Sequence, residues 1–287
     1  MQFKNSKLWL SLKKTPLIRT IRPTYIALQN IIDPLFIYAY KNNTGWAKPI
    51  PPVNLRRITS GPSIPSYVES GERIAKSLRE GLKTANKKIT DVENVLDFGC
   101  GAGRIAQYFS EYDEISFTGC DPNPNLIEWL SHNYHSRTFY NTKFHPPLPF
   151  ESNTFDLIYS VSVFTHLSEK LQFSWLQELQ RVLRQDGIAL ITVLGKHGAN
   201  RDDRLGLSNN LTKRLAEKNF IFKRTSGTKL QTELVNPNAA DEDEIYGLTY
   251  HSKQYIYQNW QDFGDIVDIK DGVIDDLQDL VVLKNSK

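Results

Sequence analysis

Short apolar runs alternate with stretches whose apolar positions recur at helical spacing over most of the chain. The apolar runs predict buried strands at 95–98, 115–120, 138–141, 155–160 and 188–194. The periodic stretches between and after them predict helices at 104–110, 125–131, 168–183 and 208–218. This alternation predicts an α/β fold, doubly wound, with a mostly parallel sheet and helices on both of its faces.

The pattern changes toward the C-terminus. An irregular insertion is predicted at about 220–250, and it includes an acidic loop at 241–244. A helix over 252–263 then leads to two further strands, 266–269 and 280–283, which bring the sheet to seven strands. The turn region around Gly272 predicts a hairpin between these two strands at the edge of the sheet.

The N-terminal part has a different character. Apolar residues from Ile21 to Leu35 recur at helical spacing, and Pro34 is expected to break or restart that helix. A proline-rich stretch at 44–65 predicts an extended connector, and Ser66 is the candidate N-cap of a helix over 66–82. We therefore divide the chain into an N-terminal helical extension with its connector, 1–65, and a second domain, 66–287.

A glycine-rich turn follows the first predicted strand and carries the most specific signal. Glycines at 99, 101 and 103 supply backbone N–H donors at a helix N-terminus and let the chain approach a ligand closely. The second strand ends in Asp121, 22 positions after Gly99, which is the distance that places a carboxylate on a ribose. The pattern predicts a site for a cofactor that contains a nucleoside.

Two residues argue against a dinucleotide. Position 104, where the third glycine of a dinucleotide motif is expected, is Arg104. Asp97 stands just before the first glycine, where a carboxylate would repel a pyrophosphate but would attract an ammonium and a sulfonium. These residues disfavour an NAD-dependent reductase.

The stretch from Val95 to Gly103 resembles motif I of the class I S-adenosylmethionine-dependent methyltransferases, which have a Rossmann-like fold. Asp121 matches the acidic end of their motif II, and the likeness continues through 148–160 and 179–193. The resemblance implies S-adenosylmethionine as cofactor, and it implies an antiparallel last strand in the sheet.

The resemblance also assigns cofactor contacts. Gly99, Cys100, Gly101 and Gly103 would run beside the methionine moiety, Asp97 would act through the ammonium, and Asp121 would accept both ribose hydroxyls. Further candidates are Tyr67, Pro122, Asn141, Thr142 and Ser160. The usual Gly-Asp after the third strand is missing, so the segment from Asn141 to Phe144 reads equally as a plain loop.

The residues that contact the methyl acceptor are harder to predict from the sequence. The loop at 160–167 follows the fourth strand and should face the transferred methyl, which makes His166 the candidate general base. The alternative is a structural His before the next helix. His251 could reach the same cleft, or it could simply start a helix, and Arg56 with Arg57 reads as a solvated basic strip or a contact for an acidic acceptor. No metal site is predicted.

Charge is unevenly distributed along the chain. Residues 1–68 carry a net charge of +9, whereas the whole chain carries +3, which leaves −6 for the remainder. The basic arm, residues 1–48, is predicted to serve peripheral membrane or anionic-surface contact, and a structural flap on the core is the alternative. Two cysteines and no long apolar span favour a cytoplasmic protein, and the basic arm adds a peripheral membrane location as the alternative.

These features favour an S-adenosylmethionine-dependent methyltransferase (EC 2.1.1.-). The expected reaction transfers a methyl group to a hydroxyl of a small molecule, a glycan or a lipid-linked acceptor of unknown identity. A nucleic acid acceptor is disfavoured, because the arm's mixture of hydrophobic and basic residues fits a lipid surface better than an aromatic-lined single-strand channel. The alternative is a non-catalytic module that keeps the fold for cofactor binding or assembly.

Overall fold

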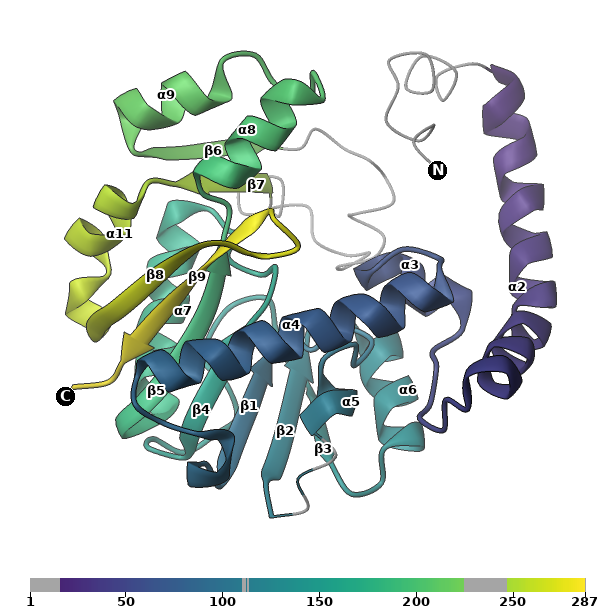
Figure 1. The fold of residues 1–287 in the computed structure, drawn as a ribbon, viewed down its shortest axis with the longest axis horizontal. Helices are drawn as coiled ribbons and strands as arrows, with labels where there is room; N and C mark the ends of the chain where they lie inside the picture. Colours follow the sequence, from purple (N-terminus) through teal and green to yellow (C-terminus); the bar gives the residue numbers. More distant parts are fainter. Residues whose placement is uncertain (1–15, 110–111, 113, 225–246, 287) are drawn as a thin grey trace.

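The computed structural model describes residues 16–109, 112, 114–224 and 247–286. A seven-stranded sheet runs through it in the order β3-β2-β1-β4-β5-β9-β8. The strands are β1 (Asn94–Phe98), β2 (Ser116–Asp121), β3 (Thr138–Asn141), β4 (Phe155–Ser160), β5 (Leu183–Val193), β8 (Asp265–Ile274) and β9 (Gln278–Lys284). The first five are parallel, and β9 is antiparallel to both of its neighbours. The predicted fold class is confirmed, including the antiparallel last strand in the chain (Figure 1).

Helices cover both faces of this sheet because strand residues alternate between two apolar layers. One layer packs α4 (Ile64–Thr84) and α5 (Ala106–Phe109) against side chains such as Val95 and Leu157. The other packs α7 (Glu169–Val182) and α11 (Lys253–Asn259) against Leu96 and Ile158. Helix α6 (Pro124–Asn133) lies beside β2 and β3. The carboxyl ends of β1, β2 and β4 are left to form a site.

A smaller unit follows β5. Helices α8 (Lys196–Arg204) and α9 (Leu211–Lys218) pack on a two-stranded antiparallel sheet of β6 (Phe220–Arg224) and β7 (Gly247–His251). The two ends of the predicted insertion at 220–250 are therefore strands. Its middle, with the acidic loop, lies outside the described residues.

Several predicted boundaries were wrong for identifiable reasons. Helix α4 begins at Ile64, because Ser63 and not Ser66 accepts the capping N–H. The hairpin between β8 and β9 turns at 275–277, where Asp275 and Asp276 adopt positive φ, and β8 continues past Gly272. The predicted helix over 252–263 is α11 followed by a short 3-10 turn, η4 (Gln261–Phe263); another such turn, η2 (Ile89–Asp91), precedes β1.

The N-terminal extension differs most from its prediction. Helix α2 (Pro16–Thr44) runs through Pro34 without a break. Proline removes one helical N–H donor, and Pro34 and Asn30 are both exposed, so water can reach the carbonyl that loses its partner. The predicted extended connector contains a helix, α3 (Val53–Thr59). In the described part of the chain, none of the helices is long and apolar enough to cross a membrane.

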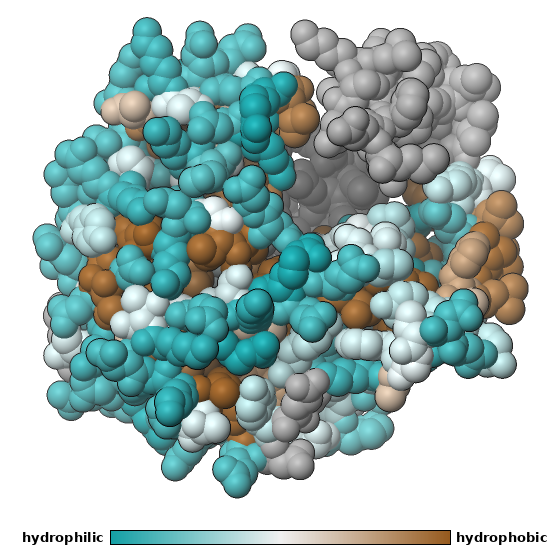
Figure 2. All heavy atoms as spheres, in the orientation of Figure 1, coloured by the Kyte–Doolittle hydropathy of each residue, from teal (hydrophilic) through white to brown (hydrophobic). Residues whose placement is uncertain are grey.

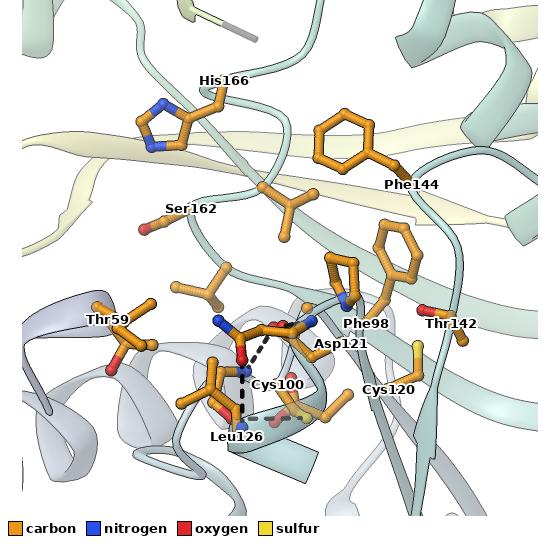
Figure 3. Close-up of a pocket in the computed structure, with 18 of the residues that line it drawn as sticks. Thr59, Phe98, Cys100, Cys120, Asp121, Leu126, Thr142, Phe144, Ser162 and His166 are labelled. Atoms are coloured by element: carbon orange, nitrogen blue, oxygen red, sulfur yellow. Dashed lines mark hydrogen bonds between the residues drawn. The ribbon is translucent and has the colours of Figure 1, made fainter. Parts of the chain in front are cut away.

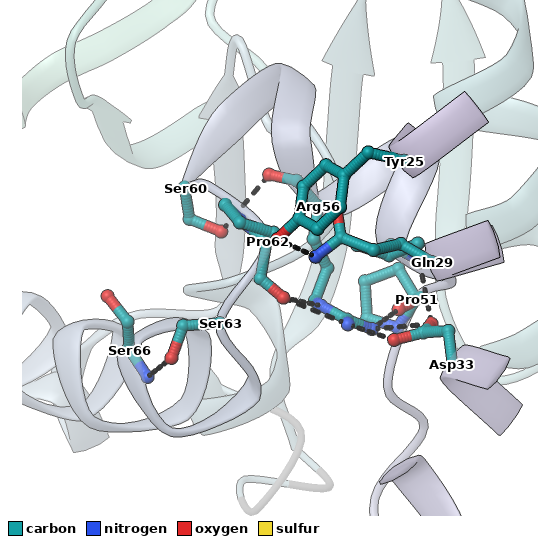
Figure 4. A network of polar contacts seen from close by, with 10 residues as sticks. Tyr25, Gln29, Asp33, Pro51, Arg56, Ser60, Pro62, Ser63 and Ser66 are labelled. Carbon is teal, nitrogen blue, oxygen red and sulfur yellow. Dashed lines mark hydrogen bonds and ion pairs between the residues drawn. The ribbon is translucent and has the colours of Figure 1, made fainter. Parts of the chain in front are cut away.

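A buried ion pair joins α2 to α3 (Figure 4). Asp33 of α2 accepts from the backbone N–H of Val53 at 2.8 Å and from both terminal nitrogens of Arg56. The Arg56 guanidinium also donates to the carbonyls of Pro51 and Pro62. Arg56 is only 1% exposed, so the predicted solvated basic strip is wrong for this residue.

Replacing Asp33 with alanine is expected to destabilise the protein by about 3–5 kcal/mol, because it leaves the Arg56 charge buried without its partner. Urea unfolding of the full chain measures the loss. The matched control is Glu80→Ala, which breaks the exposed Lys83–Glu80 pair and should leave the midpoint unchanged. Equal midpoints for Asp33→Ala and the parent would contradict a structural role for this pair.

Candidate functional site

A cavity opens at the carboxyl ends of β1, β2 and β4 (Figure 3). The glycine turn after β1, the end of β2, the loop after β3, the loop after β4 and the end of α3 all contribute to its wall. Of the predicted site residues, its lining includes Asp97, Gly99, Cys100, Gly101, Asp121, Pro122, Thr142 and His166. Residues from five separate segments are thus brought to one place.

The glycine turn needs its glycines for two reasons. Gly99 and Gly101 have φ of 79° and 55°, in the left-handed region that other L residues rarely adopt. A Cβ on Gly99 would lie 2.3 Å from Cγ2 of Val163, and one on Gly101 would lie 2.6 Å from Cγ2 of Thr59. The absence of these side chains lets the turn backbone line the cavity while two neighbouring segments close around it.

Asp97 is a buried carboxylate at the cavity floor. It is 2% exposed, and the Tyr159 hydroxyl donates to its Oδ2 at 2.9 Å. Burial raises the pKa of Asp97 to about 8, although the tyrosine hydrogen bond opposes the shift. A cation placed in the cavity would supply the missing countercharge, whereas a phosphate would not.

Asp121 is held in place by backbone N–H groups of the glycine turn and of the residues that follow β2. Its Oδ2 accepts from Gly101 at 3.0 Å, and its Oδ1 accepts from Asn123 at 2.9 Å. Burial raises the pKa of Asp121 to about 6, and the two hydrogen bonds oppose that rise. Each oxygen keeps a second lone pair, so the carboxylate can also accept two hydroxyls of a ribose.

His166 lines the opposite wall of the cavity. Its Nδ1 lies 2.8 Å from the carbonyl oxygen of Gly247, which can only accept, so Nδ1 carries the proton. Burial lowers the pKa of His166 below its ordinary value and keeps the ring neutral near pH 7. Nε2 is then the basic nitrogen, which is the state that a general base requires.

Four predicted contacts do not line the cavity. Gly103 adopts φ of 76° where a Cβ would meet Leu130, so it serves the packing of the turn on α6. The Asn141 amide donates to the carbonyl of Asp121 at 3.1 Å, and Ser160 is fully buried in β4. Tyr67 is also buried, and its hydroxyl donates to the carbonyl of Ala102. This hydrogen bond stabilises the glycine turn without contributing to the cavity lining.

His251 is likewise placed away from the cavity. It lies on β7, is 1% exposed, and its Nε2 is 2.9 Å from Oε1 of Gln172. Burial lowers the pKa of His251 to about 3, so this side chain stays neutral. Gln172 in turn donates to the carbonyls of Phe164 and Leu167, and the pair therefore braces the loop that carries His166.

Sequence reasoning missed the part of the wall that α3 supplies, namely Ile58 and Thr59. The signal was present in the apolar residues Val53, Leu55 and Ile58, but the surrounding prolines outweighed it. Ser162 was also missed. It adopts φ of 62° just after β4, and its hydroxyl accepts from Gln278 at 2.8 Å, which ties the cavity loop to β9.

Replacing Asp121 with alanine is expected to weaken S-adenosylmethionine binding about tenfold or more, since a hydrogen bond to a charged group is worth about 1.5–3 kcal/mol. Isothermal titration calorimetry gives the dissociation constant. Asp91→Ala is the control, because it removes a carboxylate that accepts from the backbone N–H of Lys88 far from the cavity. Unchanged affinity in Asp121→Ala would place the ribose elsewhere.

Comparison with known proteins agrees with this geometry. Residues 96–191 match the family described as "Methyltransferase domain". The chain is 28% identical over 141 residues to Methyltransferase GfsG of Streptomyces halstedii, covering 46% of this chain and 48% of the relative. It is 35% identical over 101 residues to the tRNA (carboxymethyluridine(34)-5-O)-methyltransferase alkbh8 of Xenopus tropicalis, covering 34% of this chain and 15% of that protein. The chain thus spans half or less of these two relatives.

Solved structures share the fold at low sequence identity. An S-adenosylmethionine-dependent methyltransferase from Clostridium acetobutylicum superposes with a TM-score of 0.51 at 10% identity, covering 75% of this chain and 92% of that one. A protein from Listeria monocytogenes described as a putative methyltransferase of the same kind gives 0.50 at 14%, covering 76% and 99%.

Residues 96–191 thus form a class I S-adenosylmethionine-dependent methyltransferase domain, with the strand order expected for that fold. This match agrees with the methyltransferase resemblance that the glycine turn and Asp121 indicated. Cys100 and Cys120 are both buried, and neither forms a disulfide.

Proposed function

We propose that this protein binds S-adenosylmethionine in the cavity at the ends of β1, β2 and β4 and transfers its methyl group to a hydroxyl. The observation that carries the proposal is the pair of acidic side chains, the buried Asp97 and the half-buried Asp121, that flank the glycine turn on adjacent parallel strands. Asp97 meets the ammonium of the methionine moiety, and Asp121 accepts the ribose hydroxyls.

The reaction is an in-line displacement at the methyl carbon. The acceptor oxygen forms the new bond to carbon while the carbon–sulfur bond breaks and its electron pair returns to sulfur. The cofactor supplies the activated methyl, so the protein mainly aligns the two reactants and excludes water. The proton of the acceptor hydroxyl goes to Nε2 of His166, whose tautomer is set by Gly247.

A hydroxyl acceptor fits the lining better than a charged amine. The cavity lining includes the apolar side chains of Ile58, Phe144, Val161 and Val163, and its lysine, Lys143, would repel a charged amine. The name of the Xenopus relative also gives oxygen as the methylated atom of its substrate. We propose a small molecule, a glycan or a lipid-linked compound as the class of acceptor.

The test supplies labelled S-adenosylmethionine and an extract of the source organism, and it identifies the labelled product by mass. A product with the methyl on oxygen supports the proposal. A product methylated on nitrogen or carbon would overturn the choice of acceptor atom. No label transfer to any compound, with the cofactor bound, would favour a non-catalytic module.

A further inference from the structure

Helix α2 exposes an apolar face on the side away from the rest of the protein. Six large side chains on it are between 53% and 74% exposed, and we call them the outer face of α2: Tyr25, Leu28, Ile31, Leu35, Phe36 and Tyr38. The four other exposed large hydrophobic side chains among the described residues lie elsewhere and are 39–47% exposed. Figure 2 shows apolar atoms gathered at the edge of the molecule where α2 lies in Figure 1.

The spacing shows that this is one face of a helix. Leu28, Ile31, Leu35 and Tyr38 follow one another at intervals of three, four and three residues, which aligns them along a single stripe. The opposite side of α2 carries Asp33, which is 4% exposed and holds α3. The helix is therefore anchored through the side that carries Asp33, and it offers its exposed apolar side to a partner.

Charge indicates what kind of partner this is. From Pro23 to Tyr40 the only charged residue is Asp33, which faces inward, whereas Arg19 and Arg22 precede the stretch and Lys41 follows it. The first 68 residues carry a net charge of +9, against −6 for the remainder. An uncharged apolar face flanked by cations is complementary to the interface of an anionic bilayer, where acyl chains lie below negative headgroups.

A second copy of the chain is the competing occupant. Paired helices normally carry charged residues on either side of the apolar seam, and these select partner and register. The positions that flank the stripe are Tyr25, Ile32, Phe36 and Ala39 on one side and Ala27, Pro34 and Lys41 on the other. Lys41, at the C-terminal end, is the single charge among them, so the stripe lacks the rows of charges that a seam carries. Two tyrosines on the outer face of α2 are also typical of side chains at a membrane interface.

We infer that the outer face of α2 docks the protein on the surface of an anionic lipid bilayer. The helix lies in the plane of the interface and does not cross it. Because α3 connects α2 to the cavity wall through Ile58 and Thr59, the docked protein would hold its cavity close to the lipid surface. The inference concerns binding alone, so it stands or fails separately from methyl transfer.

Co-sedimentation of the full chain with vesicles tests it. Binding is expected to vesicles of phosphatidylcholine with phosphatidylserine, to weaken with added salt, and to be much lower on phosphatidylcholine alone. The variant Ile31→Gln/Leu35→Gln should lower the partition constant about 10²-fold, since burial of each side chain contributes roughly tenfold. The matched control is Leu207→Gln/Val267→Gln, which removes exposed apolar side chains elsewhere and should bind like the parent.

Four results would overturn the inference. One is the absence of parent binding to anionic vesicles, and another is equal binding by the α2 variant. The third is a concentration-dependent dimer in analytical ultracentrifugation that the α2 variant abolishes, which would assign the face to a second copy. Ile31→Trp provides an independent readout that keeps the face apolar. Its added emission should shift to shorter wavelength with anionic vesicles, and an unshifted spectrum would also contradict docking.

Discussion

Replacing Asp97 with asparagine is expected to weaken S-adenosylmethionine binding by roughly 10²- to 10³-fold, the effect of leaving a buried charge without its partner. Asparagine keeps the shape of the side chain and can still accept the Tyr159 hydroxyl, so the change removes mainly the charge. Titration calorimetry measures the difference between the two proteins. An affinity within a few-fold of the parent would show that Asp97 does not interact with the ammonium group of the cofactor.

The same substitution should raise the stability of the ligand-free protein. The pKa of Asp97 is about 8 in the folded protein, above its unfolded value, so the folded state holds a proton that the unfolded state releases. Stability of the ligand-free protein is therefore lost as the pH rises from about 4 to 8, and Asp97→Asn should abolish that loss. Melting temperatures at pH 5 and pH 8, measured for both proteins, test the sign.

Asp156→Asn is the matched control for both effects. Backbone N–H groups of Glu93 and Asn94 and the Arg184 guanidinium lower the pKa of Asp156, so its charge stabilises the fold. The control should lower the melting temperature near neutral pH and leave cofactor affinity unchanged. Opposite signs in the two variants would show that Asp97 is kept ionisable for the ligand at a cost in stability.

Cofactor affinity should depend on pH through the same group. Below pH 8 the free carboxyl is protonated, and a bound ammonium favours the carboxylate, so binding must release a proton. Affinity is expected to rise as the pH is raised from 6 toward 8, by at most about tenfold per unit. The Asp97→Asn protein should lack this dependence.

Replacing His166 with alanine is expected to lower the rate of methyl transfer about 10²- to 10⁴-fold with little change in cofactor affinity, as for removal of a general base. The lowered pKa of His166 predicts a rate that is independent of pH near neutrality and that falls in acid as the ring takes a proton. Single-turnover rates with the identified acceptor across this range test both statements.

His166→Asn distinguishes catalysis from support. The asparagine amide can replace Nδ1–H as donor to the Gly247 carbonyl, but it offers no basic nitrogen in place of Nε2. A general base predicts that this variant is as slow as His166→Ala. Recovery of the parent rate in His166→Asn would show instead that the side chain only ties the loop after β4 to β7.

The segments around the glycine turn could be predicted from the sequence, because short-range features determine their structure. The motif around Gly99 combines a buried strand, left-handed glycines and an acidic end to the next strand. Each of these three features is determined by a short stretch of neighbouring residues, so it can be recognised in the sequence. The structure accordingly places Asp97, Gly99, Gly101 and Asp121 around one cavity.

The errors occurred where distant contacts decide the outcome. The prolines around α3 predict an extended chain, but the buried pair of Asp33 and Arg56 gives that helix a partner 23 residues away. His251 has the residue type of a catalytic group, yet its place on β7 sets it against Gln172. Tyr67 lies in the first turns of α4, which packs near the glycine turn. Its hydroxyl donates to the carbonyl of Ala102 in that turn and does not line the cavity.

Calorimetric titration of the full chain with S-adenosylmethionine, S-adenosylhomocysteine and NAD tests the central claim most directly. The two carboxylates around the glycine turn predict micromolar binding of both sulfur nucleosides, about −8 kcal/mol, and no measurable binding of NAD, whose pyrophosphate would face Asp97. Binding of NAD without binding of either sulfur nucleoside would contradict the account.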